Sequence, residues 1–186
     1  MAGRRPEGDR PAQLLAAACQ LAESTPQFQA VLGAGAGDHA TARFLRELRR
    51  RAEAFGAKDC HERKLCGASG FAVDFYFEAE RTIVEVALGL PNSQSEFEKD
   101  VFKAMLARHH GHGVDRLLFI TRAGGRKKCA QPGRAAVIAW VRDHHDLVVE
   151  VHDLPGEPRR RVRMRPASIT RTTPQQVQPR PSRSLG

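Results

Sequence analysis

Two short apolar segments that each contain one acidic residue constrain this chain more than any other feature. Residues 71–77 and 82–88 have the composition and alternation of paired strands, and the polar residues 78–81 form the turn between them. Asp74 lies inside the first segment and Glu85 inside the second. An ionised carboxylate in a buried strand costs free energy unless a positive charge or a metal ion compensates it. The hairpin therefore predicts either a metal-binding pair or two acids at a sheet edge that reach solvent or an arginine.

The segments around this hairpin predict an α/β fold with a mixed central β-sheet flanked by helices. Helices are expected at residues 11–23, 38–55, 95–110 and 132–144. Further strands are expected at 114–121 and 147–151, a basic loop at 123–131, and either a loop or a first strand at 58–68. Asp38 is the expected N-cap of the second helix, and Ser95 with Glu98 forms the capping box of the third. Because strand–helix crossovers follow the hairpin, parallel and antiparallel pairs are expected in one sheet.

Charge and composition divide the chain into three parts. Residues 1–37 form an N-terminal helical extension with a glycine-rich linker, 38–157 the α/β domain, and 158–186 a disordered arginine-rich tail. The whole chain has a net charge of +9, and eight of its 30 basic residues are arginines that follow Glu157. Residues 1–157 therefore hold 22 basic and 21 acidic residues, a net charge of +1. A basic disordered arm is either a sequence-independent contact to nucleic acid or a solubilising extension.

Three basic groups are candidate contacts to a phosphate backbone. The candidates in the loop after the central strand are Arg126, Lys127 and Lys128. Those at the start of the tail are Arg159, Arg160 and Arg161. The helix at 38–55 carries a basic face made of Arg43, Arg46, Arg49, Arg50 and Arg51. Each group has an alternative interpretation as plain solvated surface.

Several protein classes are not supported by the sequence. No run approaches the roughly 18–20 apolar residues of a membrane span. The N-terminal apolar run is short and contains Gln20 and Glu23, so a helix is expected there and not a signal peptide. The four cysteines form no CxxC pair, which favours free thiols and a cytoplasmic protein without a membrane partner. A zinc site is the weaker alternative, because Cys60 and Cys66 are spaced more widely than zinc ligands usually are.

The order of helix, hairpin with Asp then Glu, helix and strand resembles the PD-(D/E)XK nuclease superfamily. That superfamily has an αβββαβ core, also called restriction-endonuclease-like, with catalytic residues on its second and third strands. The resemblance covers residues 38–154 and rests on this layout together with the runs VDF, which contains Asp74, and VEVA, which contains Glu85. It implies that the two acids hold Mg²⁺ or Mn²⁺, with the peptide carbonyl of Val86 as a further ligand. It also implies hydrolysis of a phosphodiester, with DNA as the favoured substrate.

The chain departs from the family pattern at one position. The family's lysine, two residues after the second acid, falls on Ala87. In some members the following helix supplies that lysine, and here Lys99 and Lys103 are the candidates to orient water or stabilise developing charge. At roughly 100° per residue, the large apolar residues of this helix define an inward side that includes Glu98. This placement mildly favours Lys99 and puts Lys103 on the surface, while Glu98 either caps the helix or extends the acidic cluster.

The sequence therefore leads to one main hypothesis, one alternative on the same fold, and a third hypothesis of a structural protein with no nucleic-acid role. The main hypothesis is a Mg²⁺-dependent endonuclease whose arginine-rich tail adds grip on DNA. The alternative, which Ala87 supports, is a catalytically inactive nucleic-acid-binding or protein-interaction module on the same fold. Both leave open whether the chain acts as a homodimer or with a partner protein.

Overall fold

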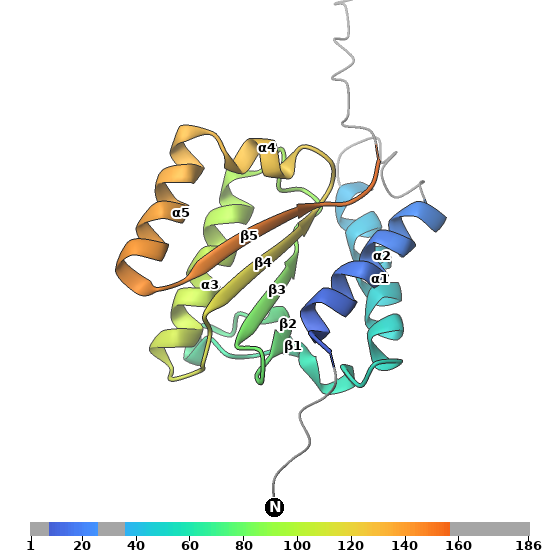
Figure 1. Cartoon of the computed structure of the whole chain (residues 1–186), viewed down its shortest axis with the longest axis horizontal. Helices are drawn as coiled ribbons and strands as arrows, with labels where there is room; N and C mark the ends of the chain where they lie inside the picture. The colour runs from blue at the N-terminus through green and yellow to red at the C-terminus, as the bar shows by residue number, and fades with distance from the viewer. Residues whose placement is uncertain (1–7, 26–35, 157–186) are drawn as a thin grey trace, which may run out of the picture.

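A five-stranded mixed sheet with helices on both faces forms the centre of the molecule (Figure 1). The computed structural model describes residues 8–25 and 36–156. Its helices are α1 (Arg10–Ser24), α2 (Ala36–Glu53), α3 (Gln94–His109), α4 (Gly125–Cys129) and α5 (Pro132–His145). Its strands are β1 (His61–Arg63), β2 (Val73–Phe77), β3 (Thr82–Val86), β4 (Arg116–Thr121) and β5 (Val148–Asp153). The predicted α/β class and mixed sheet are thereby confirmed.

The strands follow one another across the sheet in chain order, β1-β2-β3-β4-β5. β1, β2 and β3 pair antiparallel, whereas β3, β4 and β5 pair parallel. β4 lies between two strands, as its apolar composition predicted, and five of its six residues are buried. The switch from antiparallel to parallel pairing places α3, which follows β3, against one face of the sheet.

The alternation of side chains along β2, β3 and β4 produces two cores, one on each face. The first core joins α1 and α2 to strand residues such as Phe75 and Phe77. The second joins α3 and α5 to strand residues such as Ile83 and Phe119. Full burial of one such side chain stabilises the fold by about 1.5–3 kcal/mol. Leu14 of α1 is fully buried in the first core, so this helix is part of the same packed unit as the sheet.

Several local predictions are corrected by side-chain contacts. α3 is capped by Ser93 and not by Ser95, because the Ser93 hydroxyl accepts a hydrogen bond from the Glu96 N–H at 3.1 Å. α2 begins at Ala36, two residues before the expected cap. The expected basic loop contains the short helix α4, whose first backbone N–H groups donate to the carboxylate of Asp153 on β5. Residues 61–63 form the edge strand β1.

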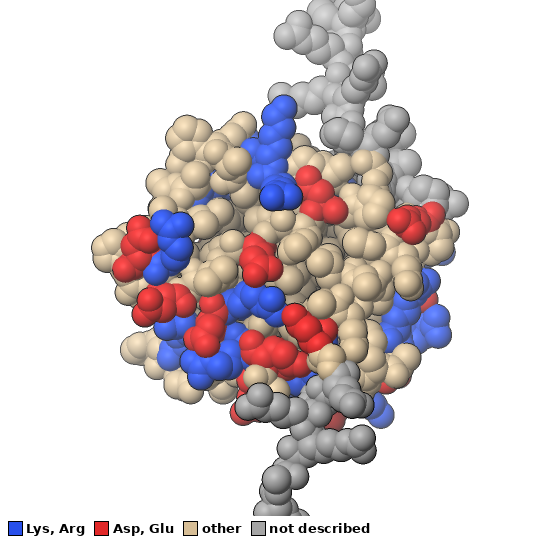
Figure 2. All heavy atoms as spheres, in the orientation of Figure 1, with Lys and Arg blue, Asp and Glu red and all other residues tan. Residues whose placement is uncertain are grey.

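The terminal and linker predictions fall partly outside the described residues. The tail, with Arg159, Arg160 and Arg161, lies there, as do residues 33–35 of the glycine-rich linker. No helix within residues 8–25 and 36–156 is long and apolar enough to cross a bilayer. On the face shown in Figure 2, basic and acidic side chains are intermixed, so this face carries no continuous basic area.

A buried arginine fixes the loop between β3 and α3. The guanidinium of Arg134, on α5, is 2% exposed and lies over the ring of Phe97, with 5.2 Å from its central carbon to the ring centroid. It donates hydrogen bonds to the backbone carbonyls of Leu90 at 2.9 Å and Ser93 at 2.7 Å. It also donates to the Gln94 side-chain oxygen at 2.9 Å. The loop that leads from Glu85 into α3 is therefore held by α5, which packs in the second core together with α3.

Removal of this arginine is expected to destabilise the fold without touching the candidate site. Arg134→Ala removes the donor from the buried Leu90 carbonyl and the half-buried Ser93 carbonyl and leaves an empty space beside Phe97, which should lower the free energy of unfolding by about 3 kcal/mol. The exposed Arg142 on the same helix bonds only to its neighbour Asp143, and Arg142→Ala should change it by less than about 0.5 kcal/mol. Urea denaturation of both variants measures the difference. Equal losses would contradict the structural role given to Arg134.

Candidate functional site

The two acids predicted from the hairpin lie on adjacent strands at the end of their ladder. The last backbone pairs of β2 and β3 on this side join Phe75 to Val84. Beyond them, the Asp74 carboxylate accepts a hydrogen bond from the Val86 N–H at 2.8 Å. Asp74 is half-buried and Glu85 is only 2% exposed. The Asp74 side chain on β2 thus accepts the hydrogen bond that a backbone carbonyl would otherwise accept from β3. Its carboxylate contacts Val86, the residue that follows Glu85.

Glu85 forms part of a buried three-residue cluster with α3. The Lys103 ammonium lies 3.1 Å from Glu85 Oε1 and 2.8 Å from Asp100 Oδ1. Asp100 is 3% exposed and Lys103 is 8% exposed. One ammonium therefore bridges two buried carboxylates, which is the compensation that an acid in an apolar strand needs.

The pKa values in this cluster follow from burial and from like charges. Burial, then the neighbouring Asp100 and Asp74 carboxylates, raise the pKa of Glu85 well above its ordinary value, and Lys103 only partly opposes this. Burial also raises the pKa of Asp100. Burial alone would lower the pKa of Lys103, but the Glu85 and Asp100 carboxylates outweigh it and hold this pKa above its ordinary value. Lys103 is therefore a cation at neutral pH.

The placement of the α3 residues corrects the helix-wheel prediction. Lys99 and Glu98 are exposed, with Glu98 accepting a hydrogen bond from Gln94 at 2.8 Å, and neither faces inward. The prediction that Lys103 lies on the surface is wrong. The helical wheel assigns every large apolar residue to the inward side, whereas Phe102 is 54% exposed. The buried side of α3 consists of Phe97, Asp100, Val101, Lys103, Ala104 and Ala107.

Asp100 is a site residue that the sequence reasoning missed. It lies three residues before Lys103, so the two side chains share a helix face and form an i,i+3 ion pair. The signal was present in the spacing of Phe97, Val101, Ala104 and Ala107, which repeats every three to four residues. Asp100 and Lys103 lie on that same side of the helix, and oppositely charged residues in such positions indicate a buried ion pair.

A residue from α2 reaches the same acids from another side. Arg49 donates a hydrogen bond to Glu62 Oε1 at 2.6 Å, and its second terminal nitrogen lies 3.9 Å from Asp74 Oδ1. Asp74 is therefore in contact with both β3 and α2. The remaining predicted contacts, Arg126, Lys127 and Lys128, lie on α4, where the first two are exposed and the third is half-buried.

The donor set around Asp74 and Glu85 suits a hard cation. Within the described ranges no group of three or more His, Cys, Asp or Glu residues is placed to hold a metal ion. Mg²⁺, however, commonly takes one or two protein carboxylates and completes its shell with water and phosphate oxygens. The raised pKa of Glu85 reflects burial first and then repulsion by the Asp100 and Asp74 carboxylates, and an added cation would relieve that repulsion. The residues present are therefore compatible with Mg²⁺ or Mn²⁺.

Comparison with protein-family models, with curated proteins and with solved structures finds no match to this chain.

Proposed function

We propose that this protein is a Mg²⁺-dependent nuclease with a PD-(D/E)XK type of core, acting on DNA. The observation that supports this most is the position of the Lys103 ammonium, 3.1 Å from the Glu85 carboxylate. Glu85 lies on β3, next to the strand that carries Asp74. It supplies from α3 the positive charge that Ala87 cannot supply. The element order α2, β1, β2, β3, α3, β4 is also that of an αβββαβ core.

Each residue of the site has a role that its surroundings favour. Asp74 and Glu85 would hold the metal ion, together with the carbonyl oxygen of Val86. When bound, the ion would act as a Lewis acid on the phosphodiester and lower the pKa of a bound water. Lys103 would stabilise negative charge on the phosphoryl oxygens or orient the water, because its raised pKa keeps it protonated and unsuited to act as a base. Asp100 would position Lys103 through their 2.8 Å ion pair.

Metal removal tests this proposal directly. The purified full chain is expected to nick supercoiled plasmid or cut single-stranded DNA in Mg²⁺ or Mn²⁺, and to lose this activity in EDTA. Excess Mg²⁺ should restore it, since the two carboxylates bind the ion reversibly. Gel electrophoresis of both substrates measures the cleavage. Activity that persists in EDTA would contradict a metal-dependent site.

A second candidate function is a nucleic-acid-binding module without chemistry. The observation that favours it is the position of Lys103 between two carboxylates, which also satisfies a purely structural ion-pair cluster. In that case the chain binds DNA but leaves plasmid and single strands intact in both Mg²⁺ and Mn²⁺. The same assay therefore separates the two functions.

A further inference from the structure

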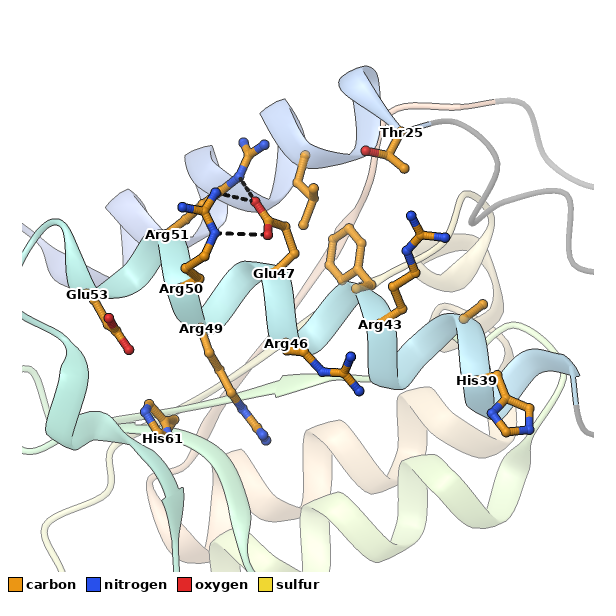
Figure 3. Close-up of a pocket in the computed structure, with 13 residues that line it drawn as sticks. Thr25, His39, Arg43, Arg46, Glu47, Arg49, Arg50, Arg51, Glu53 and His61 are labelled. Carbon is orange, nitrogen blue, oxygen red and sulfur yellow. Dashed lines mark hydrogen bonds and ion pairs between the residues drawn. The ribbon is translucent and has the colours of Figure 1, made fainter.

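A surface cavity beside α2 carries a row of three arginines, and two of them have no part in the acid site. Its volume is about 870 Å³, and it is lined by α2, by the end of α1 and by His61 on β1 (Figure 3). Arg43, Arg46 and Arg49 follow one another at intervals of three residues along α2, and we call them the arginine row. Five arginines and two glutamates line the cavity, so its fixed side-chain charge is positive.

The glutamates of the cavity do not neutralise the arginine row. Glu47 accepts hydrogen bonds from Arg50 at 2.7 Å and from Arg51 at 3.3 Å, so its charge is committed to these two residues. Figure 3 shows this group on the side of α2 that faces α1, away from Arg46 and Arg49. Arg43 and Arg46 are exposed and form no ion pair with any residue in the described ranges. Two unneutralised guanidinium groups are therefore available to an anion.

The row leads to the candidate catalytic acids. Arg49, its last member, lies 3.9 Å from Asp74 Oδ1. Two residues that line the same cavity, Arg49 and His61, each have a buried nitrogen, Nε and Nδ1 respectively, without a hydrogen-bond partner among the described residues. A buried polar atom without a partner costs free energy, and an acceptor that reached Arg49 Nε–H would lower that cost. The row rises roughly 9 Å along the helix axis from Arg43 to Arg49, so its length suits a polyanionic strand better than a single small anion.

We propose that the arginine row binds the phosphate backbone of the DNA strand and leads it to Asp74 and Glu85. This inference rests on the proposed function, and it identifies a grip within the folded domain that is separate from the arginine-rich tail. Contacts of this kind are independent of base sequence, and each one releases counterions from the DNA. The affinity should therefore depend on salt through Arg43 and Arg46.

The test compares two double variants of the full chain that lose the same charge. Arg43→Gln/Arg46→Gln removes the two unpaired members of the row. The control Arg50→Gln/Arg142→Gln removes two arginines that are already paired with Glu47 and Asp143. Fluorescence anisotropy with labelled single- and double-stranded 30-mers, in EDTA and at several NaCl concentrations, measures binding without turnover. Circular dichroism checks that both variants are folded.

The two outcomes are distinct. The row variant should bind about tenfold or more weakly at 0.1 M salt, and its slope of log affinity against log salt should be smaller by about 1.4 for single strands and 1.8 for duplex. The control should stay within about twofold of wild type and keep its slope. An unchanged slope in the row variant, or equal losses in both variants, would overturn the inference. Wild type that binds through the row but never cleaves would refute only the proposed nuclease activity.

Discussion

Glu85→Gln is expected to abolish Mg²⁺-dependent cleavage of DNA while it makes the folded protein less sensitive to rising pH. The amide keeps an oxygen that can accept from Lys103 but loses the negative charge that a cation needs. Cleavage of supercoiled plasmid should fall by about 10³-fold, the scale seen when a charged group is removed from a reacting centre. Plasmid nicking under single-turnover conditions measures the loss.

Whereas Glu85→Gln lowers activity, it is expected to raise stability relative to wild type as the pH rises. The reason is that burying the ionised Glu85 carboxylate costs free energy. The folded-state pKa of Glu85 is raised by burial and by Asp100 and Asp74, so between its ordinary value of about 4.3 and that raised value the folded state binds more protons than the unfolded chain. Its contribution to stability is complete below pH 4 and is lost as the pH rises through the raised pKa. Urea denaturation at several pH values from 4 to 8 should show this loss in wild type and not in Glu85→Gln.

Glu98→Gln is the matched control for this variant. Glu98 is exposed, and its carboxylate accepts a hydrogen bond from Gln94, one turn away on the same helix. The cleavage rate should not change in it. If Glu98→Gln lost activity while Glu85→Gln kept it, the site would be assigned to the wrong carboxylates.

Lys103→Met is expected to remove both activity and much of the stability, whereas Lys99→Met removes neither. Methionine leaves the Glu85 and Asp100 carboxylates buried without a cation, and breaking a buried ion pair in this way costs about 3–5 kcal/mol. Uptake of protons by the two acids relieves part of this cost, so the variant should be least stable at high pH. Exposed Lys99 carries no such burden, and its replacement should change stability by less than about 0.5 kcal/mol.

Two further variants keep this prediction testable if Lys103→Met does not fold. Lys103→Arg preserves the charge and should fold, with cleavage reduced but measurable, because the larger guanidinium cannot take the same position. Asp100→Asn keeps Glu85 and Lys103 paired and should lower cleavage about 10- to 100-fold, as loss of a supporting contact does. Circular dichroism, urea denaturation and plasmid nicking are measured on all four. Full activity in Lys103→Met would exclude this lysine from the chemistry.

The sequence predicted the two strands that carry Asp74 and Glu85 because the signals of a strand are local. Alternating apolar residues around Asp74 and Glu85 define a hairpin whatever packs on it. The orientation of α3 against the sheet is a tertiary property. A helical wheel weighted by large residues predicts that Phe102 faces the sheet. Ala104 and Ala107 lie on the buried side instead, since small residues let a helix approach the sheet closely. That rotation decides whether Lys99 or Lys103 meets Glu85.

Contacts between distant segments account for the other differences. α4 carries a weak local helical signal, and its first turn is bonded to Asp153, 27 residues after Arg126. Arg49 looked like one of several surface arginines in the sequence, yet Glu62 and Asp74 surround it in the fold. Such pairs are separated by more than ten residues, and periodicity within a helix contains no information about them.

The packing of α1 determines how far the chain can be truncated at its N-terminal side. Leu14 and Ala18 are fully buried and cover the same core as Phe44 and Phe77. A fragment that begins at residue 38 would expose this apolar face to water, and proteins with large exposed apolar patches tend to self-associate. A fragment meant to keep this core covered should therefore start before Arg10.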